Sequence, residues 1–206
     1  MIKTALYSKV KSYDFEKLFK QKGYAFYTNG NHNLNIIGIR SAGARITNAF
    51  DDLLVVVYKN NKGWQRIMYQ VTTDPGEYYM KNLGTPRGTA ILVPGQYKGA
   101  YKIDKHRGKY EALCQRKPVK VYRDRNKNNV YDWDVNTLEE GLFGINIHKA
   151  GRDSKRVDMW SAGCQVFALE NEFKSFMHLC KCQIADGFPN SFTYTLLTEE
   201  ELDECK

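Results

Sequence analysis

LLVVVYKNNKGWQRIMYQV, residues 53–71, decides the fold class of this chain. Two runs rich in β-branched and aromatic residues flank the polar segment 60–63, which is the pattern of a β-hairpin. Other apolar runs bounded by Gly, Pro or Asn predict further strands. They lie at 24–39 (strand, turn, strand), at 88–103 (two strands around Pro94-Gly95), and at 117–123, 141–148 and 192–197.

Helical periodicity is confined to two segments, 12–23 and 169–181. Ser12 is a candidate N-cap for the first and Gly23 stands where a helix commonly ends. We therefore predict a mainly β fold, a β-sandwich or barrel with flanking helices. The expected organisation is an N-terminal embellishment of helix and strands (1–50), a main domain (51–198) and a loose charged tail (199–206).

Charge and hydropathy limit the classes of partner. The chain has 206 residues and a formal net charge of +8. Its basic residues are dispersed, so no nucleic-acid-binding arm is expected. No run approaches the roughly 20 apolar residues that cross a bilayer, and no apolar stretch follows the first lysine, so we expect neither a membrane span nor a secretory signal. A basic surface favours a polyanion such as a cell-wall polymer.

Five cysteines occur, an odd number without the spacing of a disulfide framework or a CxxC pair. They are Cys114, Cys164, Cys180, Cys182 and Cys205. Nor do Cys and His cluster with the spacing of a zinc site. We expect reduced thiols, at least one of which is functional.

The segment FGINIHKAGRDSKRVDMWSAGCQVF, residues 143–167, carries the chemistry. His148 ends an apolar strand, and Ser161-Ala162-Gly163-Cys164 begins thirteen residues later. Cysteine is a nucleophile as the thiolate, which a nearby imidazole can generate. Gly163 leaves room for a substrate, and backbone N–H groups of such a turn can stabilise an oxyanion by roughly 3 kcal/mol per donor. Ser161 is expected to hydrogen-bond the imidazole or the loop.

This pattern resembles the L,D-transpeptidase (YkuD-like) catalytic domain, which carries a histidine, a spacer of similar length and Ser/Thr-His-Gly-Cys. The upstream segments VTTDPG and GTPRGTAILVPGQYKGAYKI are also similar, so the resemblance spans about 53–167. The chain departs from the family at Ala162, where the family often has histidine. It departs again at Gln165 and Val166, where the family commonly has an apolar residue followed by Arg or Asn. These departures affect recognition of the substrate carboxylate and leave the nucleophile and the base in place.

The resemblance implies acyl transfer or hydrolysis on peptidoglycan stem peptides through a Cys164 thioester, with His148 as base. No cofactor or metal is expected, and the protein is expected to act as a monomer. The N-terminal sequence favours cytoplasmic synthesis and delivery to the cell wall, as for a phage-released lysin, and hence cleavage over cross-linking. Residues that could line the substrate cleft are Trp160, Ala162, His106 and Arg107.

The alternatives are one function of another class and two other Cys–His arrangements. A non-catalytic cell-wall-binding or virion structural module would keep the fold without activity. Papain-like and NlpC/P60-like hydrolases place the cysteine before the histidine, whereas only His178 follows Cys164. Sortases need an arginine shortly after the cysteine, and the last arginine of the chain is Arg156.

The polar segment 124–134 resembles the start of a calcium-binding loop. Its oxygen-bearing side chains alternate along the chain, at Asp124, Asn126, Asn128 and Asp132. Asn129 stands where such loops have glycine, and Val135 where they have a bidentate glutamate. The sequence therefore favours a plain polar turn. Two other charged residues are interpreted as structural: Arg40 is expected to pair with Asp51 or Asp52, and Asp74 to shape a turn.

Overall fold

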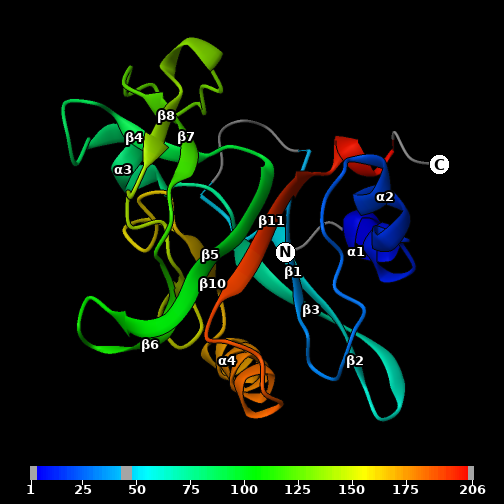
Figure 1. Cartoon of the computed structure of the whole chain (residues 1–206). Coiled ribbons are helices and arrows are strands. Elements are labelled where there is room, and N and C mark those ends of the chain that lie inside the picture. Colours follow the sequence, from blue (N-terminus) through cyan, green and yellow to red (C-terminus); the bar gives the residue numbers. More distant parts are fainter. Residues whose placement is uncertain (1–3, 43–47, 204–206) are drawn as a thin grey trace.

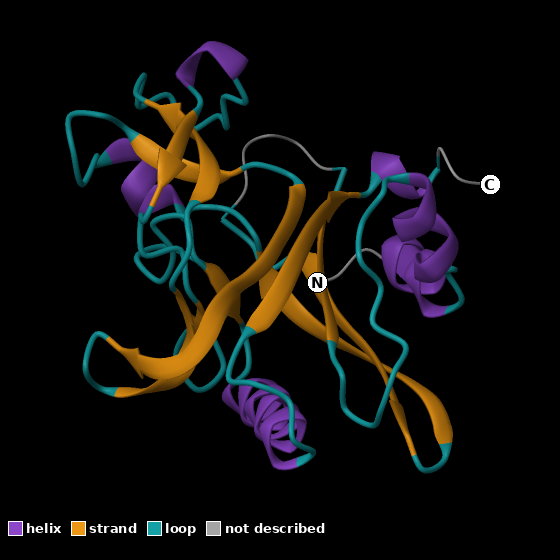
Figure 2. Cartoon of the chain, viewed as in Figure 1, coloured by secondary structure: helices purple, strands orange, loops and turns teal. Residues whose placement is uncertain are grey.

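A closed barrel of eight strands forms the body of the protein, in the order β1-β11-β5-β6-β9-β10-β3-β2 (Figure 1). The computed structural model describes residues 4–42 and 48–203. The prediction of a mainly β fold with flanking helices is confirmed, as Figure 2 shows. The barrel strands are β1 (Asn35–Arg40), β2 (Asp52–Asn60), β3 (Gly63–Thr72), β5 (Gly95–His106), β6 (Tyr110–Gln115), β9 (Ile147–Lys149), β10 (Gln165–Phe167) and β11 (Phe192–Thr198).

The hairpin of β2 and β3 is buried on both faces of β2. Leu54 and Val56 point into the barrel core, whereas Leu53 and Val55 pack outward against the helices α1 (Thr4–Lys11) and α2 (Phe15–Gln21). Side chains alternate along a strand, so a strand covered on both sides needs a continuous apolar run. That requirement explains the run that begins at Leu53.

Helix α4 (Glu170–Ala185) lies across one end of the barrel (Figure 1). Phe173 and Phe176 project from it onto Phe167 of β10, with ring centroids 5.5 and 5.1 Å apart. These aromatic contacts join the helix to the barrel core and hold the short strand β10 in place.

A second, three-stranded sheet stands at the other end, in the order β4-β7-β8. Its strands are β4 (Thr89–Leu92), β7 (Val119–Asp124) and β8 (Glu139–Gly141), and α3 (Glu77–Lys81) packs beside them (Figure 1). The 3₁₀ turns η1 (Val135–Thr137) and η2 (Glu200–Leu202) complete the elements. No helix in the described part of the chain has the length and apolar character to span a membrane.

Several sequence expectations need correction. The boundary drawn at residue 51 divides the barrel, because β1 pairs with both β2 and β11. The strand expected at 141–148 is two strands of different sheets, β8 and β9, separated at Gly144, whose φ is +72°. The N-cap of α2 is Asp14, which accepts a hydrogen bond from the N–H of Lys17, and not Ser12.

The tail expected to be loose is anchored over its first part. Leu202 is fully buried in the cluster formed with α1 and α2. Lys22 and Lys9 pair with Glu201 and Asp203 at 2.7 and 2.6 Å. These contacts attach the segment after β11 to the two N-terminal helices. Cys205 lies outside the described residues.

Arg40 is buried at the end of β1 and pairs directly with Asp74, whereas its link to Asp52 runs through Thr73. Its Nε lies 2.9 Å from Asp74 Oδ1 and 3.3 Å from Thr73 Oγ1. The Thr73 hydroxyl in turn donates to Asp52 Oδ2 at 2.8 Å. One guanidinium therefore serves two buried carboxyl groups, and burial raises the pKa of Asp74.

Candidate functional site

Strands β9 and β10 run parallel and bring Cys164 next to the strand of His148. In their register His148 is opposite Val166, and the N–H of Gln165 donates to the carbonyl oxygen of Asn146 at 2.9 Å. The thiol residue therefore stands opposite Asn146. Since side chains alternate along strands, Cys164, Asn146 and His148 share one face. The nucleophile and the base predicted from sequence are thus on neighbouring strands, displaced by two positions.

The hydrogen bonds of His148 determine which ring nitrogen is basic. Its Nδ1 lies 2.8 Å from the carbonyl oxygen of Lys149, which can only accept, so Nδ1 carries the proton. Nε2 is left with its lone pair. The side chain is 4% exposed, and burial, reinforced by the neighbouring His106, lowers the pKa of His148 to about 3. The imidazole is therefore neutral at physiological pH, with its lone pair on Nε2.

His106 lies against His148 and has the opposite tautomer. The two rings stack with centroids 4.2 Å apart and planes 20° apart. His106 Nδ1 is 3.0 Å from the side-chain amide nitrogen of Asn146, whose oxygen accepts from the N–H of Gln115. The amide nitrogen can only donate, so His106 Nδ1 accepts and Nε2 carries the proton. His106 is a hydrogen-bond donor in this site.

The Cys164 thiol is half-buried. Its Sγ donates to the carbonyl oxygen of Gly144 at 3.4 Å and accepts from the N–H of Asn146 at 3.5 Å. Both partners are backbone atoms, so neither bond involves an imidazole. Burial raises the pKa of Cys164 to about 11. The resting site thus holds a neutral thiol, and its hydrogen bonds are with the backbone of Gly144 and Asn146 and not with an imidazole.

The turn before Cys164 is folded by Ser161. Its buried hydroxyl donates to the carbonyl oxygen of Cys164 at 2.7 Å and accepts from the N–H of Gly163 at 3.1 Å. Ser161 therefore orders the loop and does not contact the imidazole. Gly163 has a φ of +120°, and a Cβ there would lie 2.3 Å from the carbonyl oxygen of Ala90. Its N–H is occupied by the Ser161 hydroxyl.

A groove of about 320 Å³ lies beside this turn, between it and the small sheet. Arg123 contributes its guanidinium, which pairs with Glu139 at 3.0 Å and lies 4.7 Å from the Phe143 ring centroid. Two larger hollows, of about 470 and 450 Å³, have no Cys or His in their linings. The groove is lined by Tyr79, Gly84, Thr85, Gly88, Thr89, Ala90, Arg123, Phe143 and Ala162.

The remaining predicted site residues are Ala162, Arg107 and Trp160, and they lie in different places. Ala162 lines the groove. Arg107 is exposed in the β5–β6 turn with a φ of +49°, and its charge lowers the pKa of both Cys164 and His148. Trp160, 46% exposed, lies beside Gly151 and is not part of the groove lining. The structure therefore supports Ala162 and Arg107 as neighbours of the site and places Trp160 apart from the groove.

Sequence reasoning missed Asn146, Tyr110 and Gly144. Asn146 contacts both the thiol and His106, and the Tyr110 hydroxyl donates to the carbonyl oxygen of Lys149 at 3.2 Å. Asn146 precedes His148 by two positions in the same predicted strand, so strand alternation alone could have placed it on the histidine's face. The contact of Gly144 depends on a loop whose path the sequence pattern does not give.

Comparisons with family models, with curated proteins and with solved structures find no match for this chain. The case for its function therefore rests on the residues around Cys164.

The raised pKa of Cys164 has a testable consequence. A raised pKa means less thiolate at neutral pH, so alkylation by iodoacetamide is expected to be slow at pH 7. It should accelerate about tenfold per pH unit up to about pH 10. The rate is measured by mass spectrometry of the Cys164 peptide. Cys182, a half-buried thiol of α4, serves as an internal comparison. A constant rate from pH 5 to 8 would instead indicate a thiolate–imidazolium pair.

Proposed function

We propose that this protein is a cysteine-dependent enzyme that transfers or hydrolyses acyl groups of peptidoglycan stem peptides, as L,D-transpeptidases do. One observation carries the proposal. Cys164 and His148 share a face of adjacent parallel strands, and the bond from His148 Nδ1 to the Lys149 carbonyl leaves Nε2 free to accept the thiol proton. Ser161 and Gly163 hold the turn that presents the nucleophile.

The reaction follows from these groups. Cys164 rotates from Gly144, gives its proton to His148 Nε2, and its sulfur attacks a peptide carbonyl. The Cys164 N–H stabilises the oxyanion. The C–N bond breaks, the leaving amine takes the proton from the imidazolium, and a thioester remains. An amine that attacks the thioester yields a cross-link, and water yields a free carboxylate. In both cases His148 removes the proton of the attacking group and returns it to the thiolate.

The neighbouring groups have supporting roles in this proposal. His106, protonated at Nε2, faces the site as a donor, and Asn146 holds both its ring and the thiol. The groove beside Ala162 offers room for the acyl donor, and Arg123 in its lining could meet a stem-peptide carboxylate. Arg107, in the β5–β6 turn, adds positive charge that acts on Cys164. The net charge of +8 favours approach to an anionic wall polymer.

The experiment is digestion of purified peptidoglycan by the wild type and by Cys164→Ala, followed by mass spectrometry of the muropeptides. Stem fragments with a new carboxylate indicate hydrolysis, and new linked stems indicate transfer. Either product must disappear with Cys164→Ala, while Cys182→Ala, which removes a half-buried thiol of α4, must retain it. Peptidoglycan unchanged by the wild type, or equal product with Cys164→Ala, would refute the enzyme assignment.

A second function is favoured by one observation: the resting thiol binds Gly144 and not an imidazole. A non-catalytic module that binds the cell wall could keep this arrangement. A carbapenem distinguishes the two functions, because an active site of this class should be acylated at Cys164 in preference to the other cysteines. Retention of the protein on sacculi without acylation or turnover would favour the binding module.

A further inference from the structure

Asp124, the last residue of β7, has a buried carboxylate oxygen without a hydrogen-bond partner. The residue is 1% exposed. Its Oδ2 accepts from the N–H of Asp132 at 3.0 Å, but no donor is within hydrogen-bond range of Oδ1 in the described chain. A buried ionised oxygen without a partner destabilises a fold unless a cation or donor compensates it.

The chain that follows brings more oxygen atoms to this carboxylate. The loop 125–134 connects β7 to β8, and the bond from Asp132 back to Asp124 closes it. Asn126 also contacts Asp132, with its amide nitrogen 2.5 Å from Oδ2. Hydrogen bonds therefore link the first, third and ninth residues of the loop.

The two departures from a calcium-loop sequence, Asn129 and Val135, have different structural consequences. Asn129 adopts a φ of +64°, the left-handed conformation for which glycine is usual, and asparagine adopts it more readily than most residues. This departure is therefore compensated. Val135, in place of the bidentate glutamate, is 65% exposed and supplies no carboxylate. Asp134 is engaged as the N-cap of η1, where it accepts from the N–H of Asn136 at 2.9 Å.

We infer that this loop binds a calcium ion through the free Oδ1 of Asp124. The other ligands are side-chain oxygens of the loop and the backbone carbonyl of its seventh residue, with water completing the shell. Without the twelfth-position glutamate the site has two carboxylates, and a dissociation constant of about 10⁻⁴–10⁻³ M is expected, as in extracellular modules. The described chain contains no cluster of three His, Cys, Asp or Glu for a tighter site. The ligands are Asp124, Asn126, Asn128, Val130 and Asp132.

The ion would act on the wall of the groove. Asp124 follows Arg123, whose guanidinium lines the groove and pairs with Glu139 of β8. A cation that fixes the β7–β8 connection would hold this pair in place. Calcium binding requires only Asp124 and its loop, and it does not depend on the activity of Cys164.

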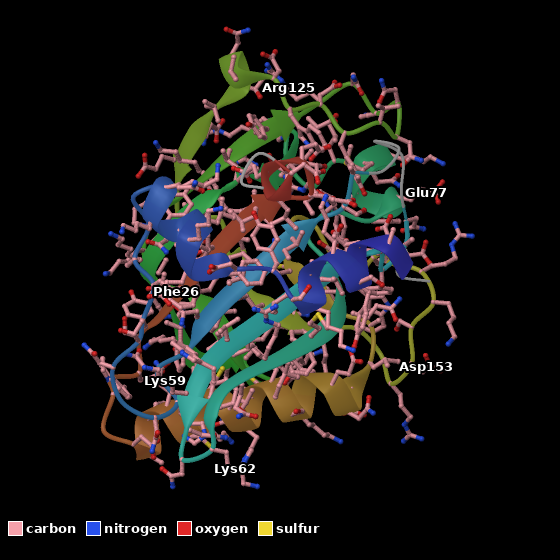
Figure 3. The ribbon with its side chains drawn as sticks, turned by 90° about the vertical axis from the view of Figure 1, so that its right-hand side faces the viewer. Phe26, Lys59, Lys62, Glu77, Arg125 and Asp153 are labelled. Atoms are coloured by element: carbon pink, nitrogen blue, oxygen red, sulfur yellow. The ribbon has the colours of Figure 1, made fainter. Side chains whose placement is uncertain are left out.

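Terbium emission tests the site directly. Trp133 and Tyr131 lie in the loop and can sensitise a bound Tb³⁺. Emission on excitation of the aromatic residues is expected to rise on terbium addition, to fall with millimolar calcium, and to be lost in Asp124→Asn. Asp153→Asn is the matched control, because Asp153 is exposed and lies well apart from loop residue Arg125 in Figure 3. Equal emission from the wild type and Asp124→Asn, or equal loss in both variants, would overturn the inference.

Thermal unfolding gives a second test, because calcium is expected to change the order of the melting temperatures of the wild type and Asp124→Asn. In EDTA, Asp124→Asn is expected to melt at or above the wild-type temperature, because it removes the uncompensated buried charge. In 10 mM calcium the wild type should gain roughly 3–10 °C, and Asp124→Asn should gain nothing. Asp132→Asn, which removes the second carboxylate, should reduce the gain. An unchanged wild-type melting temperature in calcium would contradict the inference, as would an equal gain in Asp124→Asn.

Discussion

Replacement of His148 by Gln is expected to lower the rate of stem-peptide turnover by about 10²–10⁴-fold, the usual contribution of a general base. The neutral imidazole presents an unprotonated Nε2 on the face of Cys164, because its Nδ1 donates to the Lys149 carbonyl. Glutamine has similar size and hydrogen-bonding capacity but cannot accept the thiol proton. The measurement is the initial rate of muropeptide formation at saturating substrate.

His106→Gln is the matched comparison. His106 stacks on His148 and is equally buried, but the Asn146 amide occupies its Nδ1 and Nε2 carries a proton, so it cannot be the base in this state. Its loss should cost about tenfold or less, the effect of one hydrogen bond. Melting temperatures of both variants separate catalytic from structural effects. A larger loss in His106→Gln than in His148→Gln would show that the base was assigned to the wrong ring.

Replacement of Arg40 by Ala is expected to lower the free energy of unfolding by about 3–5 kcal/mol, the cost of leaving a buried ion pair without one partner. Asp74 would lose its counter-charge, and the backbone carbonyl oxygens of Thr73 and Leu92 would each lose one donor. Urea unfolding measures the change. Arg40→Met combined with Asp74→Asn removes both charges and should recover part of the loss.

The Arg40→Ala deficit should depend on pH. Burial already raises the pKa of Asp74 and Asp52, and loss of the guanidinium raises them further. A carboxyl whose pKa is higher in the folded state binds more protons folded than unfolded, so stability falls as pH rises above the unfolded value. The deficit is therefore expected to be smaller at pH 5 than at pH 8. Equal deficits at the two pH values would mean that both carboxyls keep their charge or find other donors.

Local signals made much of the barrel predictable. The hairpin of β2 and β3 has its turn where the sequence indicates it, since Asn60 pairs with Gly63. The segment before β1 is predicted to contain a strand because aromatic residues favour strands, but the structure has none there. Tyr24 and Phe26 instead pack edge-on against Phe19 of α2, with centroids 5.9 and 5.5 Å away. Tertiary contacts, which sequence alone does not supply, decided the structure there.

The candidate site was predictable in part for the same reason. Cys164 and His148 are separated by a spacing that two short parallel strands can bridge, and the sequence shows that spacing. The stack of His106 on His148 depends on the pairing of β6 with β9, where Leu113 opposes Ile147. Strands of three residues such as β9 and β10 are too short to show a periodic pattern, so their partners could not be predicted.

The parallel pairing of β1 with β11 has a consequence for synthesis of the protein. Ile36 pairs with Tyr194 and Ile39 with Leu197, so the barrel closes between segments about 160 residues apart in the chain. On the ribosome, β1 must wait for β11 while most of the polypeptide is made. During that interval one edge of β1 has no neighbour in the sheet, which exposes it to pairing with other nascent chains. Chaperone binding to the growing polypeptide is expected to be greatest before residues 192–198 emerge.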